Sequence, residues 1–161
     1  MNPIDDRVRD LGLILPEEFR SPTGVRYPFS WVRRRGNRAY VSGHLPMALD
    51  GSLGSIVGKV GAEVSLDQAI LAARAAGLSM LGSLQRELGS LDRVTAWLRV
   101  FGMVNVAPGF AQIPAVVNGF SNLILEVYGA ERGAHARSAV GMANLPFDLP
   151  VEIEAEVEIV E

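Results

Sequence analysis

The chain of 161 residues contains no cysteine and only two histidines. Without cysteine it can form no disulfide, no thiolate metal site and no thiol nucleophile. His44 and His135 lie far apart in the sequence and match no spacing of metal ligands. The chain also lacks an apolar run of the roughly 20 residues that a membrane span requires. Metal centres of these kinds and membrane-spanning helices are therefore not expected.

The charge narrows the function classes further. The net charge of −3 argues against a broad nucleic-acid-binding surface, because such surfaces are strongly basic. The first ten residues, MNPIDDRVRD, carry acids where a secretory signal would carry basic and then apolar residues, so we expect the cytosol. The basic cluster of Arg33, Arg34, Arg35 and Arg38 straddles an expected hairpin turn. It fits either a solvated turn or a contact with an anion or a partner.

The hydrophobic pattern predicts a single α+β domain over residues 1–161, with a helical extension over about residues 1–26. Asn2-Pro3 fits the start of a short first helix. Residues 65–68 (SLDQ) form a capping box that opens a long helix, and Gly89 is a natural stop. The expected strands are Phe29–Arg35, Arg38–His44 after a tight turn at Gly36-Asn37, Val94–Val106 with a kink at Gly102, Arg137–Asn144 and Pro150–Glu161; a second long helix ends at Tyr128. Two helices packed on one face of a mixed sheet are the natural two-layer solution for this order.

The last expected strand alternates strictly between apolar and acidic residues. Its odd-numbered positions from Val151 to Ile159 are apolar, and its even-numbered positions from Glu152 to Glu158 are glutamates. Successive side chains of a strand point to opposite faces, so all four glutamates share one face. Taken alone, the pattern favours the solvated face of an edge strand, where acids deter pairing with another sheet.

Arg137 is the side chain for which the pattern most strongly indicates binding chemistry. It shares a strand face only with Ala139 and Gly141, so its guanidinium has open space around it. A planar, bidentate donor beside a small cavity suits a carboxylate ligand, and an ion pair with a neighbouring glutamate is the alternative. His135 falls on the same face if the strand begins early enough. Asn118, in the middle of a helix, fits either a specific hydrogen bond or solvent exposure.

Three blocks of the sequence, in the right order and spacing from about Gly36 to Glu161, resemble the RidA/YjgF family of reactive-intermediate deaminases. They are similar to the family's strand-end motif, its strand–loop–helix junction and its C-terminal signature. The blocks are YVSGHLP (residues 40–46), NVAPGF (105–110) with Val117-Asn118, and ARSAVG (136–141) with Leu145-Pro146 and VEIEA (151–155).

The resemblance implies a chorismate-mutase-like α+β fold, assembled as a homotrimer with three clefts between subunits. The implied reaction is hydrolysis of enamine or imine intermediates, such as 2-aminoacrylate, to a 2-keto acid and ammonia, with no metal or organic cofactor. Arg137 matches the family's carboxylate-binding arginine, and Glu152 matches its glutamate that positions or activates water. Gly43 and Ala139 fall where backbone groups contact the ligand, and Asn118 matches a commonly shared helix asparagine.

Three positions depart from the usual family pattern. Phe29 falls where deaminase members typically have tyrosine, Ala139 where they have cysteine, and His44 where glutamine is more usual. Phe29 therefore lacks a hydroxyl that could bind substrate, and His44 would place a titratable group near the proposed cleft. The segment before Tyr27 is also longer than in compact members. These features resemble a divergent branch of longer YjgF-like proteins.

Three functions are consistent with the sequence. The first is deamination of reactive imines. The second is a non-catalytic module that holds a small carboxylate in the same clefts. The third, RNA cleavage by an endoribonuclease, is disfavoured by the acidic chain and by the absence of clustered histidines.

Overall fold

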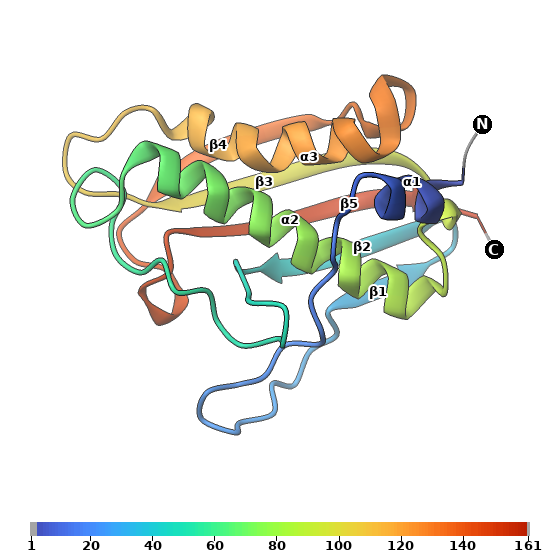
Figure 1. The fold of residues 1–161 in the computed structure, drawn as a ribbon, viewed down its shortest axis with the longest axis horizontal. Coiled ribbons are helices and arrows are strands. Elements are labelled where there is room, and N and C mark those ends of the chain that lie inside the picture. The colour runs from blue at the N-terminus through green and yellow to red at the C-terminus, as the bar shows by residue number, and fades with distance from the viewer. Residues whose placement is uncertain (1–2, 161) are drawn as a thin grey trace.

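Five strands and two long helices form two layers in the computed structural model, which describes residues 3–160 (Figure 1). The strand order in the sheet is β1-β2-β5-β3-β4. Only β3 and β4 pair in parallel, so the sheet is mixed, as predicted. The elements are α1 (Ile4–Asp10), β1 (Val32–Arg35), β2 (Arg38–His44), α2 (Leu66–Leu88), η1 (Leu91–Arg93), β3 (Val94–Asn105), α3 (Ile113–Gly133), β4 (Ala136–Met142), η2 (Pro146–Asp148) and β5 (Val151–Ile159).

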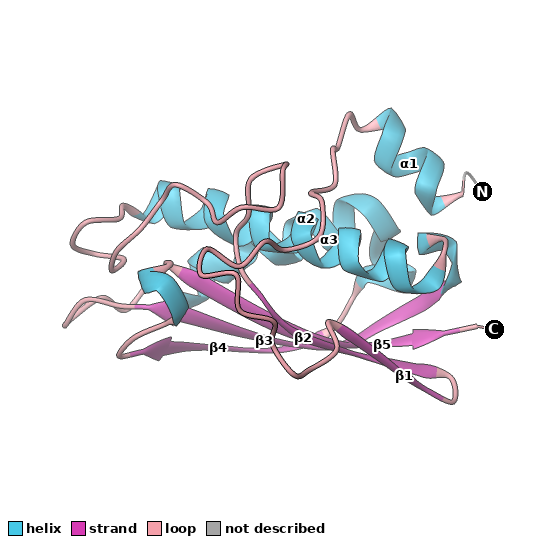
Figure 2. Ribbon diagram, turned by 90° about the horizontal axis from the view of Figure 1, so that it is seen from below, coloured by secondary structure: helices cyan, strands magenta, loops and turns pink. Residues whose placement is uncertain are grey.

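Both long helices cover the same face of the sheet, and no helix of the described chain lies against the other face (Figure 2). The alternation along β5 agrees with this arrangement. From Val151 to Ile159 its apolar side chains are buried under the helices, whereas its glutamates point to the uncovered face. The predicted α+β architecture with two helices on one side is therefore confirmed.

The two long helices pack closely because glycine occupies their contact points. The capping box at Ser65 and Gln68 is formed as predicted, and Gly89 ends α2 with a left-handed backbone. A Cβ atom on Gly119 of α3 would lie 2.1 Å from the carbonyl oxygen of Ile70, so any larger residue would push the helices apart. The backbone turns out of the helical conformation at Gly129, directly after the predicted end of the helix at Tyr128.

Several expected details differ in the structure. β1 begins at Val32 instead of Phe29, because Phe29 packs edge-on against Trp31 with 4.9 Å between ring centroids instead of pairing with a strand. β5 lies between β2 and β3, so the edge-strand explanation of its glutamates is wrong. β3 is not kinked at Gly102; there a Cβ atom would lie 2.6 Å from Val117, and glycine lets α3 approach the sheet.

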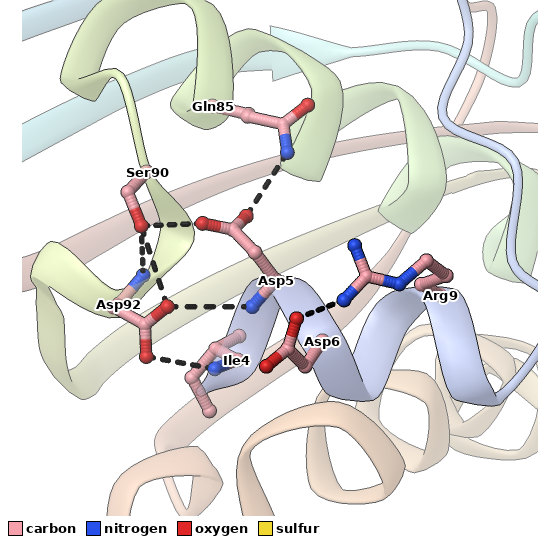
Figure 3. Close-up of polar contacts among 7 residues, drawn as sticks. All are labelled: Ile4, Asp5, Asp6, Arg9, Gln85, Ser90 and Asp92. Atoms are coloured by element: carbon pink, nitrogen blue, oxygen red, sulfur yellow. Dashed lines mark hydrogen bonds and ion pairs between the residues drawn. The ribbon is translucent and has the colours of Figure 1, made fainter. Parts of the chain in front are cut away.

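The short N-terminal helix α1 is fixed to the body of the protein by two aspartates that cap each other's helix (Figure 3). The backbone N–H of Ile4 donates to Asp92 Oδ1 over 2.7 Å, which satisfies a free donor at the start of α1. In return Asp5 accepts hydrogen bonds from Ser90, Gln85 and the backbone N–H of Leu91 at the start of η1. Asn2 and Glu161, the outer limits expected for the first helix and the last strand, lie outside the described residues.

The helices of residues 3–160 do not include one with the length and apolar character that a membrane crossing demands.

We expect Asp92→Ala to lower the free energy of unfolding by about 1–3 kcal/mol, because two part-buried backbone N–H groups lose their acceptor. The matched control is Asp6→Ala on the same helix, which removes only an exposed ion pair with Arg9 and should cost less than about 1 kcal/mol. Urea denaturation of both variants measures the difference. Equal losses in the two variants would contradict the reciprocal-capping role of Asp92.

Candidate functional site

The residues predicted for the site lie in two clusters on opposite faces of the sheet. The arginine cluster consists of Arg137 on β4 with Asn118 and Ser121 on α3, and it lies on the helix-covered side. The glutamate pocket is built around Glu152 on β5 and Gly43 on β2. Each cluster offers different chemistry.

Side chains and backbone of α3 fix the guanidinium of Arg137. Its Nη1 donates to Asn118 Oδ1 over 2.9 Å and to Ser121 Oγ over 3.0 Å, and its Nη2 donates to the carbonyl oxygen of Pro114 over 3.3 Å. A guanidinium has five N–H donors, so at least two remain for a ligand. Within residues 3–160 Arg137 forms no ion pair, which excludes the neighbouring glutamates as its partners in the isolated chain. Asn118 is both hydrogen-bonded to Arg137 and exposed to solvent, so both interpretations of this residue hold.

His135 contacts Arg137 indirectly, through Ser121. Its Nδ1 lies 2.7 Å from the carbonyl oxygen of Gly133 and must carry the proton, because that oxygen can only accept. In the neutral ring Nε2 then accepts the Ser121 hydroxyl over 2.9 Å, and the Ser121 oxygen accepts from Arg137. Burial, together with the charge of Arg137, lowers the pKa of His135 from its ordinary value and favours this neutral form, although the Gly133 carbonyl acts in the opposite direction.

The glutamate pocket has a volume of about 350 Å³ and is mostly apolar. Burial, with a smaller contribution from the charge of Glu154, raises the pKa of Glu152 above its ordinary value. A carboxyl group whose pKa is shifted toward neutrality is suited to donate and accept protons. The pocket is lined by Phe19, Tyr27, Phe29, Trp31, Gly43, Leu45, Pro146, Phe147 and Glu152.

An irregularity in β2 brings Gly43 to Glu152. The pairing of β2 with β5 shifts register between Val41 and His44, and both of these residues are buried although they are three positions apart. Strict alternation would put them on opposite faces, so one additional residue is accommodated as a bulge. A Cβ atom on Gly43 would lie 2.2 Å from Glu152 Oε1, which means that only glycine leaves room for the carboxyl group in this position.

His44 does not line the cleft, contrary to the prediction. The bulge turns its side chain into the core, where it is 1% exposed. Its Nδ1 donates to the Ser42 carbonyl oxygen over 2.6 Å, and its Nε2 accepts the Ser83 hydroxyl over 2.8 Å. The ring lies 5.2 Å from Trp31, centroid to centroid, and so supports the wall of the glutamate pocket from behind. Burial lowers the pKa of His44 to about 4.

The remaining predicted residues contribute in simpler ways. Phe29, 51% exposed, forms part of the rim of the glutamate pocket. Ala139 pairs with Gly102 of β3 and packs its methyl group against the core, so only its backbone could serve a ligand. Gly43 and Phe29 thus belong with Glu152, whereas Asn118 and Ala139 belong with Arg137.

A single chain does not bring Arg137 and Glu152 together. Glu152 is opposite Met103 on β3, Met103 is opposite Val140 on β4, and Arg137 lies three residues before Val140. Two strand spacings and three residues along a strand separate the two Cα atoms by about 14 Å. The side chains moreover point to opposite faces, so a substrate of a few carbon atoms cannot touch both within one copy.

Comparisons with known proteins identify the relatives of this arrangement. Residues 5–151 match a family model described as "YjgF/chorismate mutase-like, putative endoribonuclease". The chain belongs to this family. It is 43% identical over 150 residues to Protein TCP17 of Trypanosoma cruzi, covering 92% of this chain and 89% of the relative.

Solved structures agree with the family assignment. The protein Atu1372 of Agrobacterium tumefaciens is 38% identical, with a TM-score of 0.83 over 97% of this chain and 91% of that chain. A Shewanella oneidensis protein described in the same endoribonuclease terms is 26% identical, with a TM-score of 0.88 over 98% and 100% of the two chains. RidA from an Antarctic Psychrobacter, at 20% identity and a TM-score of 0.55 over 91% and 94% of the chains, shares the fold.

Two features of the YjgF-like site were missed in the sequence. Ser121 lies three residues after Asn118, and this spacing places both on one helix face beside Arg137, which was a usable signal. The aromatic rings that line the glutamate pocket gave no such signal. Phe19 and Trp31 come from a long loop and Phe147 from the short helix η2, and the sequence pattern does not determine the course of either segment.

We expect the buried His44 to make stability depend on pH. Well above pH 6.5 the ring is neutral in both states; as the pH falls the unfolded chain binds a proton that the folded chain, with a pKa of about 4, does not. The free energy of unfolding should therefore fall by about 1.5 kcal/mol between pH 6.5 and pH 5. Urea denaturation at the two pH values measures this loss. His44→Gln should abolish most of it and His135→Gln a smaller part; an unchanged pH dependence in His44→Gln would contradict the assignment.

Proposed function

We propose that the chain hydrolyses reactive enamines and imines, such as 2-aminoacrylate and its homologues, to a 2-keto acid and ammonia. The observation that carries the proposal is the guanidinium of Arg137, fixed by α3 with donors left over for a carboxylate. Glu152, with its raised pKa in an apolar pocket, supplies the second group that such a reaction needs. The resemblance of residues 40–46, 105–110 and 136–155 to the RidA/YjgF deaminases supports the same reaction class, whereas the description of the matching family model names an endoribonuclease. The proposed location is the cytosol.

The proposed active unit is a homotrimer, in which Arg137 of one copy lies opposite Glu152 of a neighbour. The separation of the two groups within one chain supports this assembly. The uncovered sheet face supports it too, because Tyr40 is 46% exposed there and borders a groove of about 310 Å³ that Phe101 also lines. Aromatic residues on an exposed sheet face favour burial against a partner.

In this assembly each group has one role. Arg137 binds the substrate carboxylate and fixes the C=N carbon near Glu152. The Glu152 carboxyl protonates the imine nitrogen, and the resulting carboxylate accepts a proton from the water that adds to the carbon. The carbinolamine so formed loses ammonia as its hydroxyl proton moves through the same carboxyl group to nitrogen. The products are a 2-keto acid and ammonia, and Glu152 regains its starting state.

A non-catalytic module that binds small carboxylates is the second candidate. Phe29 and Ala139 favour it, because deaminase members typically carry a hydroxyl and a thiol at these two positions. Phe29 leaves the glutamate pocket without the hydroxyl, and Ala139 leaves the strand beside Arg137 without the thiol. RNA cleavage is less well supported, since the chain has a net charge of −3 and the rings of His44 and His135 are both engaged by serine hydroxyl and carbonyl groups. Ammonia release from 2-iminobutyrate above the uncatalysed rate separates the enzyme from the binding module.

We expect Arg137→Ala to raise KM for 2-iminobutyrate by about ten-fold or more, because a charge-assisted contact to the carboxylate is lost. Arg137→Lys should recover little, since lysine lacks the planar fork. Glu152→Gln should instead lower kcat by roughly 10²–10⁴-fold, or somewhat less because imines also hydrolyse without an enzyme. Ammonia release at varied substrate concentration measures both parameters.

The matched control is Glu158→Gln, which changes a glutamate on the same face of β5 that is bonded to Thr95, far from the pocket. It should leave both kinetic parameters nearly unchanged. Melting temperatures of all variants should stay close to that of the parent. Equal, mild effects of Glu152→Gln and Glu158→Gln would favour the binding module, and full activity of Arg137→Ala would refute the assignment of the carboxylate site.

A further inference from the structure

Five aromatic rings surround the entrance to the Glu152 carboxyl group. Phe19, Tyr27, Phe29 and Trp31 come from the segment before β2, and Phe147 comes from η2 between β4 and β5. Phe19, Tyr27, Phe29 and Trp31 form a closed circuit of ring contacts, and Phe147 contacts Phe19. The centroid distances run from 4.9 Å for Phe29–Trp31 to 6.5 Å for Phe19–Phe147. These five residues form the aromatic wall of the pocket.

Phe147 is held in the wall at the expense of backbone strain. Phe147 and the following Asp148 both have positive φ angles, 57° and 55°, a backbone conformation that residues other than glycine rarely adopt. The turn is held by the backbone N–H of Gly58, which donates to the Asp148 carbonyl oxygen over 2.8 Å, and by Asn105 Nδ2, which donates to Asp148 Oδ1 over 3.0 Å. Lys59 Nζ in turn donates to Asn105 Oδ1 over 2.7 Å. Strain retained by such a network indicates that the direction of Phe147 has a use.

Trp31 is held equally firmly from the other side. The backbone N–H of Ser42 donates to the Trp31 carbonyl oxygen over 3.0 Å, and the Ser42 hydroxyl donates to the carbonyl oxygen of Ser30 over 2.7 Å. The buried His44 ring supports the indole at 5.2 Å. The wall is therefore formed before any ligand binds, which favours affinity because little conformational freedom is lost on binding.

The pocket is larger and more apolar than a three-carbon imine requires. A molecule of that size would leave most of the 350 Å³, and most of the ring surface, in contact with water. An aryl or branched alkyl group would bury that surface, and an aryl group would also stack against the rings at favourable angles.

We propose that the aromatic wall binds the side chain of the substrate, and that this chain acts on 2-imino acids with a large apolar, above all aromatic, side chain. The reaction named in this inference rests on the proposed deaminase function, whereas the binding preference does not. The carboxylate of such a substrate is bound by Arg137 of the neighbouring copy, its C=N carbon faces Glu152, and its side chain lies among the five rings.

Binding is tested with the products of the proposed reaction, which are stable. Calorimetric titration of the full chain should give phenylpyruvate a dissociation constant about ten-fold or more below that of 2-oxobutyrate. Phe147→Ala and Phe29→Ala should reduce that preference to about two-fold or less. Both residues are partly exposed, at 38% and 51%, so their replacement does not open the core. Val25→Ala, an exposed apolar residue of the same loop outside the pocket, is the matched control and should retain the preference.

Turnover is tested with imines released in place from phenylalanine and from 2-aminobutyrate by an amino-acid oxidase. The aromatic imine should show the higher kcat/KM, and Phe147→Ala should lower kcat/KM for the aromatic imine by a larger factor than for the small imine. Val25→Ala should leave both values nearly unchanged. If neither imine is hydrolysed but phenylpyruvate still binds preferentially, the deaminase proposal fails and the aromatic-wall inference is supported as a binding preference.

Two results of the titration would overturn the inference. One is equal affinity of the parent protein for phenylpyruvate and 2-oxobutyrate. The other is a preference that survives in both Phe147→Ala and Phe29→Ala. Light scattering on the variants tests whether the rings contact a neighbouring copy instead of a ligand. A loss of assembly in either variant would show such a contact and would also contradict the proposal.

Discussion

The sheet separates the guanidinium of Arg137 from the carboxyl group of Glu152, and every functional conclusion depends on that separation. Arg137 points toward α3, where Asn118, Ser121 and the Pro114 carbonyl oxygen fix it. Glu152 points away from the helices, because the apolar residues that alternate with it along β5 are required in the core. Since alternation along a strand is strict, neither residue can turn to the other face, and a combined site needs two copies of the chain.

The same arrangement of histidine, serine and arginine occurs twice in the structure. His135 accepts a hydrogen bond from the Ser121 hydroxyl, and the Ser121 oxygen accepts one from Arg137. Likewise, His44 accepts a hydrogen bond from the Ser83 hydroxyl, and the Ser83 oxygen accepts one from Arg86 Nη2 over 3.2 Å. Each ring donates from Nδ1 to the carbonyl oxygen two residues earlier. In both cases burial favours the neutral ring, which is the form able to accept the serine hydroxyl. One set fixes the candidate carboxylate anchor, and the other supports the aromatic wall through Trp31.

Elements with a strong local signal were predictable from the sequence, whereas directions set by tertiary contacts were not. The capping box at Ser65, the stop at Gly89 and the alternation along β5 are fixed by neighbours in the chain, and all are confirmed. The central place of β5 and the inward turn of His44 were missed, because strand order and a one-residue bulge depend on partners distant in sequence. The strand pattern already indicated Arg137, and the family resemblance added Glu152 as a candidate residue, but only the fold shows that the two occupy opposite faces.

The most direct test of the shared site mixes two variants that are each impaired. Arg137→Ala and Glu152→Gln proteins are combined in equal amounts, unfolded together in urea and refolded, and ammonia release from 2-iminobutyrate is compared with that of each variant treated alone. If a site takes Arg137 from one copy and Glu152 from its neighbour, about a quarter of the sites in the mixture regain both groups and activity rises accordingly. Activity no higher than the average of the two separate variants would contradict the account.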